Sequence, residues 1–231
     1  MEMINEEGEE NNKSKYKIEY LGEKFSKDLK VYKVIILGLY GVGKTAIIHK
    51  LKREDFDKEY EPTISIDIKM FQVKINDRII QIQIWDTCGN DEYAQSIPNL
   101  FKNTSITILV YAINNRSSFK NLQNWYSLVK EYSFDNTIFI IGNKNDLKKE
   151  REVTIEDAET FKNNYDNVKI FLETSALYGE NMNKLFENIV ISAYEKDINV
   201  ENKLDNALRK SLTLTKEDFS KKGKEKKKKF C

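Results

Sequence analysis

From residue 31 onward, the hydrophobic positions of the chain fall into short runs that alternate with helical patterns. The run "VYKVIILG" at 31–38 is apolar and ends in glycine, which is typical of a buried parallel strand. Apolar and polar residues alternate at 64–70 and again at 80–84, with the turn sequence "INDR" between them, and this pattern predicts a hairpin. Further apolar runs predict strands at 106–111, 137–143 and 169–173.

Helical patterns lie between these runs. They predict helices over 44–53, 117–132, 154–164 and 182–196. Strands that alternate with helices, with one inserted hairpin, indicate an α/β fold with a six-stranded, mostly parallel sheet and helices on both faces.

The two ends of the chain have a different character. Residues 1–30 are polar and charged and predict a flexible N-terminal extension, with a short helical or strand-like piece near 18–21. Residues 31–197 hold the predicted domain, and residues 198–231 form a variable, Lys-rich tail.

Composition restricts the class of protein. The chain has 231 residues and 40% hydrophobic content, enough for one sizeable core, and it has no run of eighteen apolar residues to span a membrane. The first ten residues are acidic and lack the apolar segment of a secretory signal. The two cysteines, Cys88 and Cys231, give no disulfide framework, so we expect a cytosolic chain.

The formal net charge of +1 hides an asymmetry. Residues 221–231 contain seven lysines and one glutamate, which leaves a net charge of −5 on the rest of the chain. Nucleic-acid binding requires basic and aromatic residues over a folded face, whereas this charge is confined to a low-complexity tail. We therefore expect an anionic membrane surface as its partner, and no nucleic acid.

A phosphate-binding motif follows the first apolar run. "GLYGVGKT" at 38–45 matches G-x-x-x-x-G-K-[ST], and its position between a strand and a helix argues against a chance glycine-rich turn. Glycines let backbone N–H groups approach phosphates, and the helix N-terminus favours negative charge. Lys44 would neutralise phosphate oxygens, and the Thr45 hydroxyl would bind Mg²⁺.

A second motif ends the strand "IQIWDTCG". Asp86 at the end of an apolar strand is costly unless its carboxylate faces a cation, which indicates a magnesium-linked acid. Gly89 would let its backbone N–H approach the terminal phosphate. An ordinary strand-end aspartate is the weaker explanation beside a phosphate loop.

Three more segments complete the pattern: "FDKEYEPTI" at 56–64, "NKND" at 143–146 and "ETSA" at 173–176. With them, the chain from about 31 to 196 resembles a Ras-superfamily small GTPase, and within it an atypical member of the Rab family. The resemblance implies a P-loop NTPase small G domain that binds GTP or GDP with Mg²⁺. A P-loop metabolic kinase is disfavoured, because the chain offers a guanine reader and no lid or acceptor site.

The resemblance also implies roles for single residues. Phe56 would pack on the guanine, and Thr63 would bind Mg²⁺ and sense the γ-phosphate. Asp146 would accept from the N1–H and exocyclic amine of guanine, with Lys144 along the ring and Asn143 bracing the loops. The implied nucleotide-binding residues are Gly38, Tyr40, Gly41, Val42, Gly43, Lys44, Thr45, Ala46, Phe56, Thr63, Gly89, Asn143, Lys144, Asp146, Ser175 and Ala176. The implied metal residues are Thr45, Thr63 and Asp86, and the implied catalytic residues are Asn90, Lys44 and Thr63.

The Rab resemblance rests mainly on two segments. "ILVYAINNRSSFKNLQNWYSLVKE" and "SALYGENMNKLFENI" are similar to the corresponding Rab segments. Ser65, Ile68 and Ala112 depart from that family, which usually has glycine, phenylalanine and aspartate there. Ile68 replaces one member of an effector-facing aromatic triad, with Trp85 and a ring near Phe101 as the others.

Two departures affect hydrolysis. Asn90 stands where the family usually has a glutamine that orients the attacking water, and it is one methylene shorter. Tyr40 occupies a loop position that is usually glycine or serine, where its ring would block an activator's arginine or donate its own hydroxyl. We expect slow GTP hydrolysis, with a constitutively GTP-bound, hydrolysis-deficient scaffold that recruits effectors as the alternative.

The tail resembles a prenylation terminus, although it has one cysteine where Rabs usually have two. Prenylation of Cys231 plus the lysines would provide the two signals that stable anchoring requires. An unmodified, soluble tail is the alternative.

We expect a monomer on the cytosolic face of an intracellular membrane, in vesicle and protein transport. The implied partners are effectors at the switch regions, an exchange factor, a GTPase-activating protein, a prenylation escort and a GDP-dissociation inhibitor.

Overall fold

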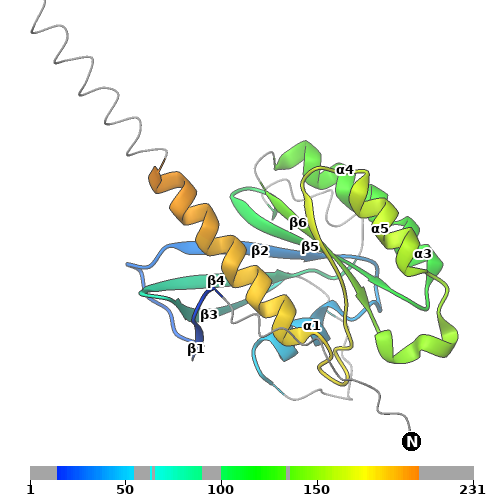
Figure 1. Cartoon of the computed structure of the whole chain (residues 1–231), viewed down its shortest axis with the longest axis horizontal. Helices are drawn as coiled ribbons and strands as arrows, with labels where there is room; N and C mark the ends of the chain where they lie inside the picture. Colours follow the sequence, from blue (N-terminus) through cyan, green and yellow to red (C-terminus); the bar gives the residue numbers. More distant parts are fainter. Residues whose placement is uncertain (1–14, 55–62, 64–65, 90–99, 134–135, 203–231) are drawn as a thin grey trace, which may run out of the picture. The chain divides into compact units, whose positions relative to one another are not determined.

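The computed structural model describes residues 15–54, 63, 66–89, 100–133 and 136–202. Its centre is a seven-stranded sheet in the order β1-β3-β4-β2-β5-β6-β7 (Figure 1). The strands are β1 Ile18–Gly22, β2 Val31–Leu37, β3 Asp67–Ile75, β4 Arg78–Asp86, β5 Thr104–Ala112, β6 Thr137–Asn143 and β7 Val168–Glu173. Neighbouring strands from β4 to β7 in this order are parallel, while β3 is antiparallel to β4 and β1 is antiparallel to β3.

The prediction of six strands is therefore corrected to seven. The added strand is β1, which lies within the segment that the sequence analysis assigned to an extension. Of the helical and strand-like forms expected near 18–21, the strand is the one present. Polar and apolar residues alternate over 15–20, and β3 offers an open edge with which β1 can pair.

The hairpin of β3 and β4 is confirmed. A two-residue connection, Asn76 and Asp77, joins the strands, and Asn76 has a positive φ of 54°. Asparagine tolerates this conformation better than most residues, which makes it a suitable turn residue. The start of the first predicted strand is corrected, because β3 begins at Asp67 rather than near residue 64, and residues 64–65 lie outside the described residues.

The predicted helices are present with adjusted ends. The helices are α1 Lys44–Leu51, α3 Arg116–Lys120, α4 Leu122–Tyr132 and α5 Ile155–Asn163, with a helix at 182–202 and a 3₁₀ helix η2 at Asn145–Glu150. The single helix predicted over 117–132 is two consecutive helices that meet at Asn121. The α5 start is fixed by a capping box, in which Thr154 and Asp157 each accept from the other's backbone N–H.

Both faces of the sheet are covered. Ile35 and Leu37 of β2 belong to the core cluster that contains residues of α3, α4 and α5, with the buried Trp125 among them. Because side chains alternate along a strand, Val34 and Ile36 face the other side, and both are fully buried there. On that other side Phe71 of β3 stacks on Phe186. In Figure 1, α3, α4 and α5 lie together away from α1.

The chain divides into two units by its internal contacts, 1–191 and 192–231. The described part of the second unit, 192–202, is helical throughout. Among the described residues no helix combines the length and the apolar character that a membrane crossing requires.

Candidate nucleotide-binding site

The predicted site residues lie where parallel strands end. Gly38 follows β2, Asp86 ends β4, Asn143 ends β6, and Ser175 comes two residues after β7. In parallel α/β sheets, ligands bind outside the carboxyl ends of the strands. The fold therefore gathers four motifs that are far apart in the sequence at one edge of the sheet.

The phosphate loop is tightly bonded to its surroundings. The side chain of Lys44 is buried, and its Nζ donates to the carbonyl oxygens of Gly38 at 3.0 Å and Leu39 at 3.3 Å. Gly43 has a φ of 97°, and a Cβ at this position would lie 2.3 Å from Nδ2 of Asn143. Only glycine fits between the loop and this asparagine without displacing one of them.

Three oxygen-bearing side chains meet beside the phosphate loop. The Thr45 hydroxyl donates to Oδ2 of Asp86 at 2.6 Å and lies 3.0 Å from the Thr63 hydroxyl. Oδ1 of Asp86 is buried without a hydrogen-bond partner, and burial raises the pKa of this carboxyl. A buried carboxylate oxygen of this kind requires a cation or a donor to balance it.

This set of donors fits Mg²⁺. Hydroxyl and carboxylate oxygens are the hard ligands that Mg²⁺ prefers, and the ion usually takes one or two carboxylates together with substrate phosphates. Within the described ranges no group of three or more His, Cys, Asp and Glu side chains is placed to hold a metal. Thr45, Thr63 and Asp86 would hold the ion, which when bound neutralises charge on phosphate oxygens.

Gly89 presses against the phosphate loop. A Cβ there would lie 2.6 Å from Nζ of Lys44, 2.7 Å from the backbone nitrogen of Tyr40 and 3.0 Å from the carbonyl oxygen of Gly38. Its φ of 75° also favours glycine. The segment after β4 can approach the loop this closely only because residue 89 has no side chain.

Asn143 connects three parts of the site. Its Nδ2 donates to the carbonyl oxygen of Val42 at 2.9 Å in the phosphate loop. Its Oδ1 accepts from the Thr174 hydroxyl and from the backbone N–H of Ala176, both at 3.2 Å. One buried amide thus uses donor and acceptor together to bind the phosphate loop to the loop after β7.

The residues expected to read the base lie beside Asn143. The Ser175 hydroxyl donates to Oδ1 of Asp146 at 2.5 Å and accepts from the backbone N–H of Tyr178. Lys144 has a positive φ of 66°, which turns the chain sharply between Asn143 and Asp146. These contacts hold the Asp146 carboxylate beside the loop after β7, next to Asn143.

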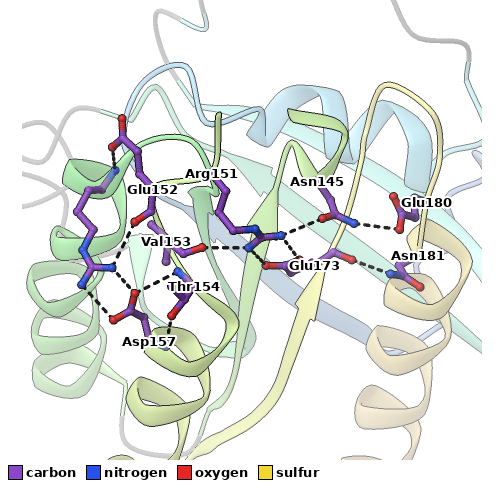
Figure 2. Close-up of polar contacts among 10 residues, drawn as sticks. Asn145, Arg151, Glu152, Val153, Thr154, Asp157, Glu173, Glu180 and Asn181 are labelled. Atoms are coloured by element: carbon purple, nitrogen blue, oxygen red, sulfur yellow. Dashed lines mark hydrogen bonds and ion pairs between the residues drawn. The ribbon is translucent and has the colours of Figure 1, made fainter. Parts of the chain in front are cut away.

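An arginine network that the sequence motifs did not predict joins these loops (Figure 2). Arg151 donates to both carboxylate oxygens of Glu173, at 2.5 and 2.8 Å, and to Oδ1 of Asn145 at 3.2 Å. Nδ2 of Asn145 donates in turn to Glu180 at 2.9 Å. The hydrogen bond to Glu173 raises the pKa of Arg151, against an opposing effect of burial.

This network joins the two loops that carry Asp146 and Ala176. The only sequence signal for it was the charge of Arg151 and Glu173, which are 22 positions apart. A bidentate arginine–carboxylate pair fixes direction as well as distance, so it resists relative rotation of the two loops.

The other predicted site residues are placed as follows. Val42 is buried in the phosphate loop, Ala46 is half-buried in the first turn of α1, and Gly41 has open space around its Cα. Tyr40 is 60% exposed, so its ring lies at the surface of the loop. The predicted residues outside the described part of the chain are Phe56, Asn90 and Cys231.

Comparison with known families agrees with this geometry. The family model described as the Ras family matches residues 33–195, which is most of the chain. Ras-family proteins are GTPases that bind GTP and GDP, generally with Mg²⁺, and they act with effectors, exchange factors and GTPase-activating proteins. The strand-end motifs, the glycines at the phosphate loop and the family match lead to one conclusion: this chain belongs to the Ras family of small GTPases.

Proposed function

We propose that this chain is a Rab-type switch that regulates vesicle and membrane traffic by cycling between GTP-bound and GDP-bound states. The observation that carries the switch is the contact of Thr63 with Thr45, which links a residue beyond α1 to the phosphate loop. A γ-phosphate with Mg²⁺ would engage both hydroxyls, and its loss would release Thr63. The Rab-like segments at 108–131 and 175–189 support the subfamily.

Hydrolysis in this proposal is slow. Asn90 is too short to orient water as the usual glutamine does, and an error of this size costs about 10²-fold in rate. Tyr40 exposes 60% of its surface beside the phosphate loop, where an activator's arginine would enter. The protein therefore depends on an activator that tolerates a tyrosine at this entrance.

Single-turnover GTP hydrolysis by the full chain tests this proposal. The nucleotide that co-purifies with the protein is first identified by chromatography. We expect GDP, a measurable slow rate and a faster intrinsic rate in Asn90→Gln. In Tyr40→Gly we expect a faster rate once a GTPase-activating protein is added. Asn163→Gln, an exposed position on α5, serves as the matched control. Unchanged rates in both site variants would reject the role of Asn90 and Tyr40.

The alternative is a scaffold that stays GTP-bound and recruits effectors without cycling. The Tyr40 ring favours it as well, because a blocked entrance would exclude activators altogether. Co-purified GTP with no detectable turnover would select this alternative over the cycling switch.

The proposed location is the cytosolic face of an intracellular membrane, with prenylated Cys231 and the Lys-rich tail as the anchor. A single lipid gives marginal binding, and each basic residue near an anionic surface adds roughly 1 kcal/mol. A prenylation escort and a GDP-dissociation inhibitor would handle the lipid. Fractionation of cells that express the wild type or Cys231→Ser tests this. Equal membrane association of the two proteins would reject Cys231 as the anchor. The lysines alone would then be the anchor, or, where neither protein is on membranes, the tail would have no anchor at all.

A further inference from the structure

The N-terminal strand contacts more than the edge of the sheet. β1 pairs with β3 in the register Ile18↔Ile75, Glu19↔Lys74 and Tyr20↔Val73. The chain then bulges, pairs Gly22 with Gln72 and continues into Glu23. We refer to residues 18–23 as the N-terminal brace.

The aromatic ring of the brace lies in a cluster on one face of the sheet. The centroid of the Tyr20 ring lies 5.5 Å from that of Phe71 and 6.1 Å from that of Phe186. The guanidinium of Arg53 lies 5.6 Å from the Tyr20 ring and 5.7 Å from the Phe186 ring. Arg53 has a positive φ of 64°, so its backbone takes a conformation that the surroundings must stabilise.

The acidic residue of the brace binds the end of α1. Nζ of Lys52, the C-cap of α1, lies 3.0 Å from Glu23 and 2.6 Å from Glu54. The Lys52 side chain is only 5% exposed. Burial lowers the pKa of Lys52, but the hydrogen bonds to the two glutamates outweigh it and raise the pKa overall. Without Glu23, the buried Lys52 ammonium would keep only Glu54 of these two carboxylates.

The other end of α1 is the phosphate site. α1 has eight residues and begins with Lys44 and Thr45, whose side chains reach Gly38 and Asp86. A short helix held at both ends moves as a unit, so its C-terminal contacts restrict its N-terminal groups. The brace also contacts Arg53 through the Tyr20 ring, and Glu23 shares the Lys52 ammonium with Glu54.

We propose that the N-terminal brace positions α1 for nucleotide retention, with Tyr20 and Glu23 as positioning residues that slow nucleotide release. The Tyr20 ring packs against Phe71 and Phe186 and contacts the guanidinium of Arg53. The Glu23 carboxylate compensates the buried charge of Lys52. This assignment requires only nucleotide binding by the domain and does not depend on the Rab subfamily or on the hydrolysis rate.

The test is the dissociation rate of a fluorescent GDP analogue from the full chain with Mg²⁺, chased by excess GDP. We expect Tyr20→Ala and Glu23→Gln each to accelerate release by about fivefold or more, the lower end of typical coupling between sites. Tyr20→Phe keeps the ring and should restore slow release. Glu19→Gln, an exposed neighbour on the same strand, is the matched control and should release GDP at the wild-type rate.

A second measurement separates positioning from simple stabilisation. The thermal midpoint of each variant is recorded beside its release rate, and hydrogen exchange is followed at residues 48–54. Faster exchange there together with faster release supports the proposal. A lower midpoint with unchanged release would show that the brace only covers the sheet edge, and would overturn it. Glu23 is half-exposed, so we expect Glu23→Gln to stay folded and its release rate to be measurable even if Tyr20→Ala unfolds.

Discussion

Individual side chains join segments of this site that are distant in the sequence. Asn143 uses its amide to connect the phosphate loop with the loop after β7, and Arg151 uses its guanidinium to connect Asn145 with Glu173. Both act by geometry, because each offers hydrogen bonds in fixed directions. Substitutions that keep charge but lose this geometry should therefore weaken nucleotide binding.

Arg151→Lys tests this point. Lysine keeps the charge but cannot form the bidentate pair with Glu173 and the bond to Asn145 together. We expect GDP affinity to fall by about tenfold, which corresponds to about 1.4 kcal/mol. Equilibrium titration with labelled GDP measures it. Arg116→Lys changes the pair with Asp157 instead and should bind GDP as the wild type does. Equal affinity in Arg151→Lys would contradict the role of the network.

Lys33 gives the molecule a pH-dependent stability. Its Nζ lies 3.7 Å from the Trp85 ring centroid and 3.3 Å from the carbonyl oxygen of Lys102, contacts that favour the ammonium. Burial acts in the opposite direction and lowers the pKa of Lys33 from 10.5 to about 8. The unfolded chain binds this proton more tightly than the folded chain between these two pH values, so this group makes folding more favourable as the pH rises through the window.

Lys33→Met should remove this contribution. We expect the free energy of unfolding of the wild type to rise more steeply, or fall less steeply, between about pH 8 and 10.5 than that of Lys33→Met. Denaturant titrations across the window measure the difference, with Lys74→Met, an exposed lysine on β3, as the control. If the free energy of unfolding changes with pH in the same way in the wild type and in Lys33→Met, then Lys33 has the same pKa in the folded and unfolded chains, which contradicts this prediction.

At the scale of elements, loops at the strand ends require backbone freedom that only particular residues provide. The phosphate loop contains three glycines with positive φ, Gly38, Gly41 and Gly43, but only two of them are also close to other atoms. Gly38 approaches the carbonyl oxygen of Val110, and Gly43 approaches Asn143, whereas Gly41 has open space. A substitution at Gly41 therefore costs backbone strain alone, whereas one at Gly38 or Gly43 costs backbone strain and steric overlap.

Gly43→Ala combines both costs and Gly41→Ala has only the first. In Gly43→Ala the new methyl would overlap Nδ2 of Asn143 at 2.3 Å and push the phosphate loop away from the loop that begins at Asn143. We expect GDP affinity to drop by well over about tenfold in Gly43→Ala and by clearly less in Gly41→Ala, measured by titration with labelled GDP. Similar losses in both variants would mean that strain alone, rather than the contact with Asn143, sets the requirement.

At the scale of the whole molecule, a bound nucleotide with its metal would link the phosphate loop to the loop that begins at Asn143. A ligand that binds only the folded state stabilises it by about 2.7 kcal/mol at a concentration of 100 times its dissociation constant. The buried Oδ1 of Asp86 needs a cation, so removal of Mg²⁺ should weaken the complex as a whole.

Chelation tests this prediction. EDTA added to the GDP complex of the full chain should accelerate GDP release and lower the thermal midpoint, because the buried Asp86 carboxylate would lose the cation that balances its charge. EDTA saturated beforehand with Mg²⁺ is the control. In Asp86→Asn the effect of EDTA should be much smaller. An EDTA effect of equal size in Asp86→Asn would place the metal elsewhere.

The amino-acid sequence by itself determined the elements whose information is local. The apolar runs predicted β2, β5, β6 and β7, the turn residues predicted the hairpin, and the spacing of "GLYGVGKT" predicted a phosphate loop between a strand and a helix. These succeed because a buried strand needs a continuous apolar run and a tight loop needs glycine, and both needs are visible in neighbouring residues.

Only the tertiary structure decided what depends on residues far apart in the chain. Polar and apolar residues alternate over 15–20, but only the folded sheet shows that β1 pairs with the edge of β3. The pair of Arg151 with Glu173 and the contacts of Tyr20 and Glu23 with the end of α1 likewise arise from the folded arrangement. Pairing edges, buried charges and ring clusters are properties of three-dimensional neighbours, so no local pattern in the sequence can encode them.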